Sequence, residues 1–181
     1  MAKKKVYDGK FIKVFEDDSG GEVYESAVFR DYVSVIPFSG PDEILLIREL
    51  RPYEDPPVRL KLVTGFIEDG LSIAENANKE LQEEMGKKAA TLFPWLVHRQ
   101  FGGINQANNF VLAFDLSDSK IDNPDGENAV LEIVPFRIAE LYRMLTAGEF
   151  TVGPTAYVLL KLCIDIREGL FVRPLSGPGG T

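Results

Sequence analysis

The sequence predicts an α+β fold, in which helices pack against a mixed β-sheet. β-Prone and helical segments follow one another irregularly, without the regular strand-helix-strand order of a parallel doubly wound sheet. The chain has 181 residues, 45% of them apolar, which is enough for one domain with a hydrophobic core. Charged residues make up 27%, so the composition is that of neither a disordered nor a fibrous protein.

The first predicted element is an N-terminal β-hairpin within residues 1–31. Residues 6–16 and 22–30 are both β-prone, and the segment between them, Asp17–Gly21, consists of turn-forming residues. We therefore expect the two segments to pair as antiparallel strands.

Residues 32–170 are expected to form the main domain, and the Ser-, Gly- and Pro-rich end of the chain, 171–181, a flexible tail. Clusters of β-branched and aromatic residues predict strands at 32–38, 43–50, 60–64, 95–101, 109–116 and 130–134. Amphipathic patterns predict helices at 72–85, 135–147 and 154–168. The proline-rich segment 51–59 and the acidic segment 117–128 are expected to be irregular.

The charge and the lack of long apolar stretches exclude several classes of partner. The formal net charge is −8, which argues against binding to nucleic acid or to an anionic membrane surface. A small phosphorylated substrate stays possible, because a bound metal ion reverses the local field. No stretch has the length of a membrane span, and the basic N-terminus lacks the apolar region of a signal peptide. We expect a cytoplasmic protein whose single cysteine, Cys163, is a buried thiol.

Three glutamates cluster on the helix predicted at residues 72–85. Glu80, Glu83 and Glu84 are spaced i, i+3 and i+4, which places them within an arc of roughly 100° on a regular α-helix. Like charges at this spacing repel, and a divalent cation would convert the repulsion into ligation. Taken alone, however, the three residues are more typical of an acidic face exposed to solvent.

The residues before the helix change this interpretation. The strand predicted at 60–64 leads into a glycine loop, Gly65–Gly70, and the helix then begins with Ser72 and Glu75 at the spacing of a capping box. A strand end, a glycine turn and a helix with clustered carboxylates together indicate a site for metal and phosphate.

The segment from Gly65 to Gly86 resembles the Nudix box. That family's pattern is G-x5-E-x7-R-E-aliphatic-x-E-E-x-G, and the spacing here holds without a gap. The matching residues are Gly65, Glu80, Leu81, Glu83, Glu84 and Gly86. Outside the box, Leu45–Pro52 and the N-terminal hairpin resemble the branch of ADP-ribose and nucleoside-diphosphate-sugar pyrophosphatases. The resemblance implies an α/β/α sandwich with a mixed sheet.

The sequence departs from the family pattern at several positions. The first glutamate of the box is replaced by Leu71, its arginine by Lys79 and its closing aliphatic residue by Lys87. Lys61, four residues before the box, stands where this branch often has glutamate, and Phe101–Gly103 replaces a Ser-Pro-Gly turn. Because lysine offers only a point charge where arginine offers a planar fork, these changes indicate a divergent substrate, weakened catalysis or a lost activity.

The resemblance implies a metal-dependent hydrolase that uses Mg²⁺ or Mn²⁺. Glu80 and Glu84 would be the main metal ligands, Glu83 would bind a further ion or orient water, and the carbonyl of Thr64 would complete the coordination. Water would attack a phosphorus of a nucleoside diphosphate linked to another group, giving two monophosphates. ADP-ribose or a nucleotide sugar is the expected substrate.

The sequence offers two candidates for the general base and three for substrate binding. The resemblance points to a glutamate on the late loop, for which Glu127 is the first candidate and Glu132 the second. A solvated acidic residue is an equally good interpretation of Glu127. Arg48, Arg51 and Arg99 are candidates for contacting the diphosphate or the terminal sugar, and structural salt bridges are an equal alternative for them.

Two further hypotheses follow from the resemblance. In this branch an N-terminal segment packs across a homodimer and lines the partner's site, so residues 1–31 are a possible dimerisation segment; otherwise they form an edge hairpin on their own sheet. The departures at Leu71, Lys79 and Lys61 favour the alternative of a catalytically weakened Nudix-fold module that binds a nucleotide or only dimerises.

Overall fold

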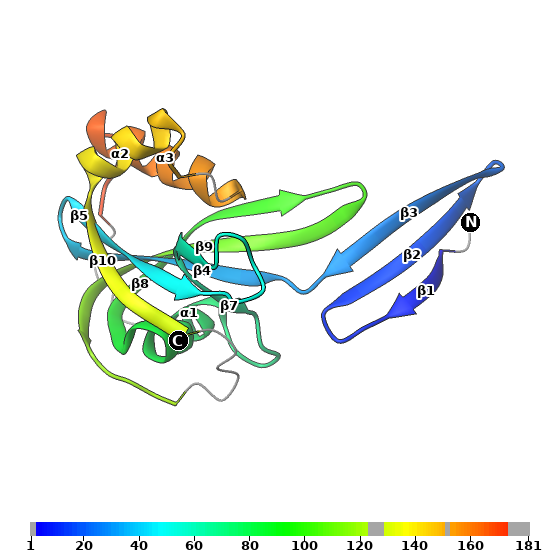
Figure 1. The fold of residues 1–181 in the computed structure, drawn as a ribbon, viewed down its shortest axis with the longest axis horizontal. Coiled ribbons are helices and arrows are strands. Elements are labelled where there is room, and N and C mark those ends of the chain that lie inside the picture. Colours follow the sequence, from blue (N-terminus) through cyan, green and yellow to red (C-terminus); the bar gives the residue numbers. More distant parts are fainter. Residues whose placement is uncertain (1–2, 123–128, 151–152, 174–181) are drawn as a thin grey trace.

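The computed structural model describes residues 3–122, 129–150 and 153–173, which form an α/β/α sandwich with a projecting N-terminal arm (Figure 1). Helix α1 covers one face of the sheet, and helices α2 and α3 cover the other. The expected tail, 171–181, lies outside the described residues from position 174 onward.

The elements follow one another in the order expected for a mixed sheet. The strands are β1 (Lys4–Asp8), β2 (Ile12–Ser19), β3 (Glu22–Phe29), β4 (Tyr32–Gly40), β5 (Glu43–Leu50), β6 (Val58–Lys61), β7 (Val63–Phe66), β8 (Lys87–Gln100), β9 (Ile104–Asp118) and β10 (Ala129–Arg137). The helices are α1 (Ile73–Glu80), continued by the π-helical turn η1 (Leu81–Met85), then α2 (Ile138–Ala147) and α3 (Gly153–Arg167).

The sheet combines parallel and antiparallel pairs. The order along its main path is β1-β2-β3-β9-β4-β5-β10, with β6 beside β5, β7 beside β4 and β8 beside β9. Strand β4 runs parallel to β9, whereas its pairing with β7 is antiparallel. Strand β7 thereby enters the sheet centre and ends at the glycine loop that precedes α1.

Strand β4 supplies side chains to both layers of the core, because successive residues of a strand point to opposite faces. Val33 and Val35 pack on the α1 side, in a cluster that includes Leu81 and Met85. Ile36 and Phe38 pack on the α2–α3 side. The amphipathic stripe predicted for the first helix therefore faces the core.

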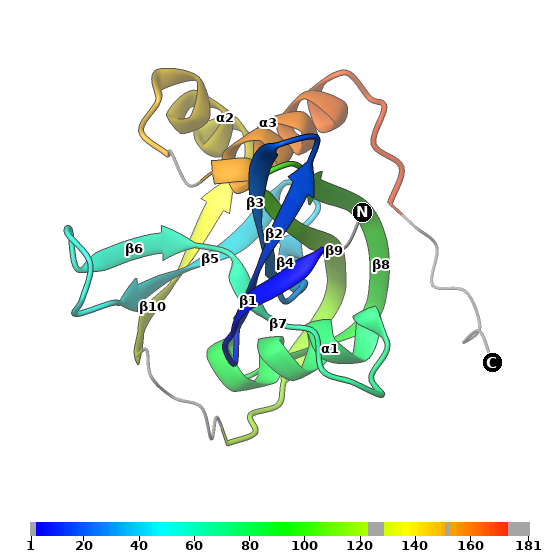
Figure 2. The same ribbon diagram turned by 90° about the vertical axis from the view of Figure 1, so that its right-hand side faces the viewer.

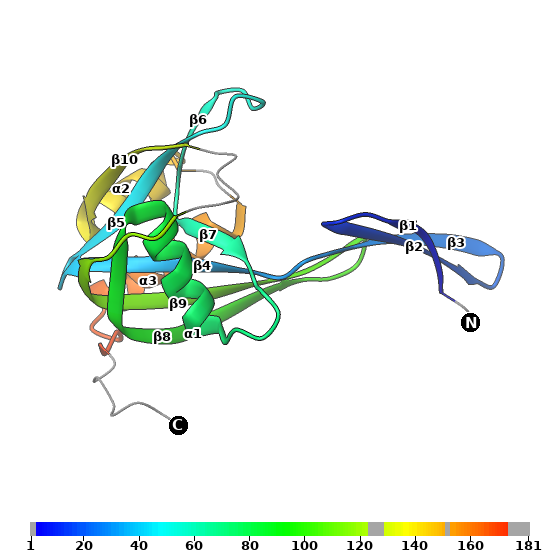
Figure 3. The ribbon, with the colours of Figure 1, turned by 90° about the horizontal axis from the view of Figure 1, so that it is seen from below.

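The N-terminal arm is a three-stranded antiparallel sheet that projects away from the sandwich (Figures 1 and 3). The predicted hairpin corresponds to β2 and β3, and the turn between them places Gly20 and Gly21 at positive φ. Strand β1 adds a third strand. The base of the arm pairs with the start of β9, at Ala27–Ile104 and Val28–Asn105.

Several boundaries differ from those predicted. Strands β8 and β9 form one long hairpin, because their polar residues pair between the two strands just as their apolar residues do. Helix α2 begins three residues later than expected, since residues 135–137 continue β10 along β5.

Seen along the arm, the two helical layers remain separated by the sheet (Figure 2). Among the described residues, no helix combines the length and apolar character needed to cross a membrane.

Candidate metal and phosphate site

The start of α1 is fixed by the predicted capping box. The Glu75 backbone N–H donates to Ser72 Oγ at 3.2 Å, and the Ser72 N–H donates to a Glu75 carboxylate oxygen at 2.7 Å. The buried Asn76 connects this turn to the preceding loop: its Oδ1 accepts from the Glu68 N–H at 2.9 Å, and its Nδ2 donates to the Ser72 carbonyl. The loop and helix are thus held together as one rigid unit.

The end of the same helix is not a regular α-helix. Residues Leu81–Met85 form a π-helical turn, which closes at Gly86 with φ of 65°. π-Turns are rare and occur frequently at functional sites. The arc calculated for a regular α-helix therefore does not apply to Glu83 and Glu84, and the three glutamates point toward different neighbours.

The Glu80 carboxylate lies directly against Gly65. A Cβ atom at position 65 would lie 1.9 Å from both Cδ and Oε1 of Glu80, so only glycine leaves room for the carboxylate there. Among the described residues, no donor forms a hydrogen bond or ion pair with it. Burial, followed by the neighbouring charges of Glu84 and Glu83, raises the pKa of Glu80 to about 7.

The Glu84 carboxylate is largely buried beside Lys61. Its Oε2 accepts a hydrogen bond from the Thr64 backbone N–H at 3.3 Å, and its Oε1 lies 3.6 Å from Lys61 Nζ. The same ammonium lies 3.0 Å from Oε1 of Glu49, whose Oε2 accepts from Arg51 Nε at 2.5 Å. Burial raises the pKa of Glu84 to about 7 despite Lys61, whereas Lys61 and Arg51 together outweigh burial and lower the pKa of Glu49.

The third glutamate, Glu83, is buried and paired with Lys79. The Lys79 ammonium lies 3.0 Å from a Glu83 oxygen and 2.9 Å from Glu68 of the preceding loop. Burial opposes the charge of Lys79, but the two carboxylates overcome it and raise the Lys79 pKa above its ordinary value. Lys79 therefore connects the loop to the helix, although it lacks the planar fork of the family's arginine.

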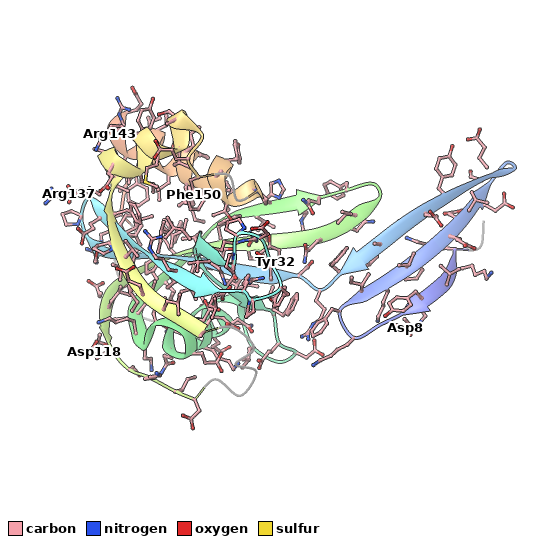
Figure 4. The ribbon with its side chains drawn as sticks, viewed as in Figure 1. Asp8, Tyr32, Asp118, Arg137, Arg143 and Phe150 are labelled. Carbon is pink, nitrogen blue, oxygen red and sulfur yellow. The ribbon has the colours of Figure 1, made fainter. Side chains whose placement is uncertain are left out.

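These carboxylates open onto a cleft of about 650 Å³ between the sandwich and the arm. Its lining includes the three box glutamates, Glu80, Glu83 and Glu84. It also includes aromatic and basic side chains, with Phe11 stacked on Phe66 at a ring-centroid distance of 5.4 Å and the Arg30 guanidinium 5.6 Å from the Phe66 ring. Tyr32, where β4 begins near the arm, also lines the cleft (Figure 4).

The predicted substrate-binding arginines do not come together in this chain. Arg51 lines the cleft, but Arg48 lies outside the lining and pairs with Glu132 at 3.1 Å on the exposed surface of β5 and β10. Arg99 is an exposed residue of β8, also outside the lining. The two candidate bases are separated in the same way: Glu132 faces Arg48, and Glu127 lies outside the described residues.

Sequence reasoning missed the aromatic lining of the cleft and the position of one cation. Phe66 stands at a variable position of the box, Phe11 and Arg30 belong to no motif, and only the folded chain brings the three together. Lys61 did give a signal, since a charged residue within a short apolar strand must either be exposed or have partners.

Comparison with known proteins identifies the class to which this fold and site belong. Residues 28–154 match the NUDIX domain family, and because the match covers more than half of the chain, the chain belongs to the Nudix family. The mixed curled sheet with three helices is the Nudix fold, which confirms the predicted fold class.

One similar solved structure is described as "Crystal structure of ADP compounds hydrolase". It is 24% identical to this chain, the match covers 94% of this chain and 92% of that one, and the TM-score is 0.73. At this identity the likeness establishes the fold alone. No curated protein matches the chain.

The residues present fit the divalent metal ion that the Nudix family typically uses. Carboxylate oxygens are the ligands preferred by Mg²⁺ and Mn²⁺, and the half-buried Glu80 carboxylate lacks a partner among the described residues. Within the same part of the chain, no three acidic, histidine or cysteine side chains converge on one point. Lys61 and Lys79 form ion pairs with Glu84 and Glu83 instead.

Proposed function

We propose that this chain is a Mg²⁺- or Mn²⁺-dependent pyrophosphohydrolase. Its expected substrate is a nucleoside diphosphate linked to a further group, with ADP-ribose or a nucleotide sugar as the class to test first. The observation that carries the proposal is a single cleft whose lining combines the box glutamates with aromatic and basic side chains.

The two kinds of lining residue suit the two halves of such a substrate. A flat, exposed ring pair such as Phe11 and Phe66 offers a stacking surface for a nucleobase, and Arg30 adds a donor and a positive charge beside it. The diphosphate would then extend toward Glu80 and Glu84, where its charge needs a counter-ion. Arg51 and Lys10, which also line the cleft, provide further positive charge near the path.

The chain's own residues would position the reaction rather than form a covalent intermediate. Glu80 and Glu84 would hold the metal ion, with Thr64 orienting Glu84 through its backbone N–H. When bound, the ion would polarise the phosphoryl oxygens and lower the pKa of the attacking water. Glu83, fixed by Lys79, would orient that water, and Glu127 remains the proposed base.

A screen of nucleoside-diphosphate compounds tests this proposal. Phosphate released by a coupled phosphatase would be measured with Mg²⁺ or Mn²⁺, with wild-type chain and Glu84→Gln side by side. We expect turnover in the wild type and a loss of more than about a hundredfold in the variant, since even groups that only orient a metal ligand contribute roughly 10–100-fold. The absence of turnover at high enzyme concentration would refute an enzymatic function.

The ion pairs of Lys61 and Lys79 favour a second candidate, a catalytically weakened module that binds the same nucleotides. Both lysines neutralise carboxylates that would otherwise be available to metal. The same screen separates the two functions when nucleotide binding is measured in parallel by calorimetry. Binding without turnover supports the module, and turnover supports the enzyme.

We also propose that the arm is a homodimer contact. Four large apolar residues of the arm are 41–63% exposed: Val6, Tyr7, Val23 and Tyr24. Leaving this much apolar surface in water is unfavourable for an arm without a partner. A second copy would cover these side chains and border the cleft at Phe11. Light scattering after size exclusion measures the mass directly, and a monomer at tens of micromolar chain would contradict this arrangement.

A further inference from the structure

Lys61 is a buried cation inside the carboxylate cluster. Its residue exposure is 5%, and its ammonium contacts Glu49 at 3.0 Å and Glu84 at 3.6 Å. Removing an ammonium group from water is costly, and the cost is offset only by close counter-charges. The two glutamates come from different elements, β5 and η1, and both line the cleft, so Lys61 joins the sheet to the box helix from behind that lining.

The cations in this region are distributed unequally over four carboxylates. Glu49 and Glu84 face Lys61, and Glu83 faces Lys79. Only Glu80 has neither an ion pair nor a hydrogen bond among the described residues. The cluster therefore has one carboxylate open to an added cation, although it contains enough oxygen atoms for several.

We propose that Lys61 is a built-in cation standing where a second divalent ion would otherwise bind, between Glu49 and Glu84. The site would then take a single divalent ion, held through Glu80 and the Glu84 oxygen that does not face Lys61, instead of several. This inference rests on the proposed metal-dependent function. An ammonium at this point supplies positive charge to the carboxylate cluster permanently, whatever the metal concentration.

The proposal predicts a change in metal stoichiometry when the charge is removed. Lys61→Met keeps the length and apolar stem of the side chain but leaves the space between Glu49 and Glu84 without its cation. Arg51 still pairs with Glu49, but Glu84 loses Lys61, and Mn²⁺ then becomes the counter-ion between the two carboxylates because hard oxygen donors in this arrangement suit it. Wild type should bind one Mn²⁺ per chain, and Lys61→Met should bind two.

A matched control comes from helix α3. Lys161 pairs with Asp165 at 2.6 Å outside the cleft, so Lys161→Met removes the same charge from the chain without touching the carboxylate cluster. Its stoichiometry should remain that of wild type. A second ion in this control would show that overall charge, not the place of Lys61, sets the number of ions.

The experiment is a calorimetric Mn²⁺ titration of the three metal-free proteins, with free Mn²⁺ counted by electron paramagnetic resonance. Two or more ions in wild type, or a single ion in folded Lys61→Met, would overturn the inference. If Lys61→Met does not fold, the wild-type stoichiometry decides alone. Wild type that turns over substrate with two ions contradicts only this inference, whereas wild type that binds no Mn²⁺ contradicts the proposed function as well.

Discussion

The contact between Gly65 and Glu80 gives a sharp prediction for the variant Gly65→Ala. Gly65 lies in strand β7, opposite Val33, and its φ is not in the left-handed region, so the backbone accepts alanine. The new Cβ, however, would lie 1.9 Å from the Glu80 carboxylate, and Cβ contacts under 3.0 Å are essentially never found. The carboxylate must therefore move by about 1 Å, the gap between these two distances.

A displacement of this size can be converted into an expected loss of rate. A misplacement of about 1 Å can reduce turnover by on the order of a hundredfold, which corresponds to roughly 2.7 kcal/mol in the activation free energy. Because the moving atoms are the flexible end of a side chain, the melting temperature should change little. Gly65→Ala should thus lose Mn²⁺ affinity and kcat together while remaining folded.

The assay compares kcat, Mn²⁺ affinity and melting temperature with those of Gly103→Ala. Gly103 is also outside the left-handed region and has no heavy atom within 4 Å of an added Cβ, so this control should behave as wild type. Gly65→Ala with wild-type turnover and metal affinity would refute the reasoning that the glycine exists to seat Glu80.

Three further predictions concern other parts of the site. Phe66→Ala should raise KM for a nucleotide substrate more than it lowers kcat, because its ring belongs to the proposed stacking surface and is not one of the groups that would hold the metal ion; an unchanged KM in steady-state kinetics would exclude base stacking there. Lys79→Met should reduce the free energy of unfolding by about 1–3 kcal/mol, since the buried Glu83 loses its partner, and urea titration measures this loss. The folded-state pKa of Glu80, about 7, lies above its ordinary value of 4.5. The contribution of Glu80 to the stability of the metal-free fold should therefore be complete below about 4.5 and lost as pH rises through 7. Glu80→Gln should flatten this slope in thermal melts, and an equally steep slope in that variant would contradict the assignment.

The parts of the fold predicted well from the sequence are those set by local patterns. Ser72 and Glu75 predicted the start of α1, and Gly20 with Gly21 predicted the hairpin turn. Both predictions succeed because capping and turn geometry depend on neighbouring residues alone. The full length of the β8–β9 hairpin was not predicted. Its polar residues can be recognised as strand residues only from their pairing with the other strand. The π-turn at Leu81–Met85 likewise has no sequence signature of its own.

The location of the candidate site could be predicted from the sequence, but the contacts among its residues could not. The spacing of the box placed Glu80, Glu83 and Glu84 near Gly65, and the chain does bring all four to one cleft. The spacing did not reveal that Lys61 lies beside Glu84, because the two residues belong to different elements that only the tertiary structure brings together. Arg48 and Arg99 were selected for charge alone, and charge does not tell which face of a strand a residue occupies.

Hydrolysis in ¹⁸O-labelled water tests the central claim most directly, that this cleft directs water onto a phosphorus atom. ADP-ribose or the best substrate from the screen would be incubated with Mg²⁺, and the products analysed by mass spectrometry. We predict two monophosphates, with the label in the phosphate group of one of them and no product from Glu84→Gln. Label on a sugar carbon, or the same product yield from Glu84→Gln, would contradict the account.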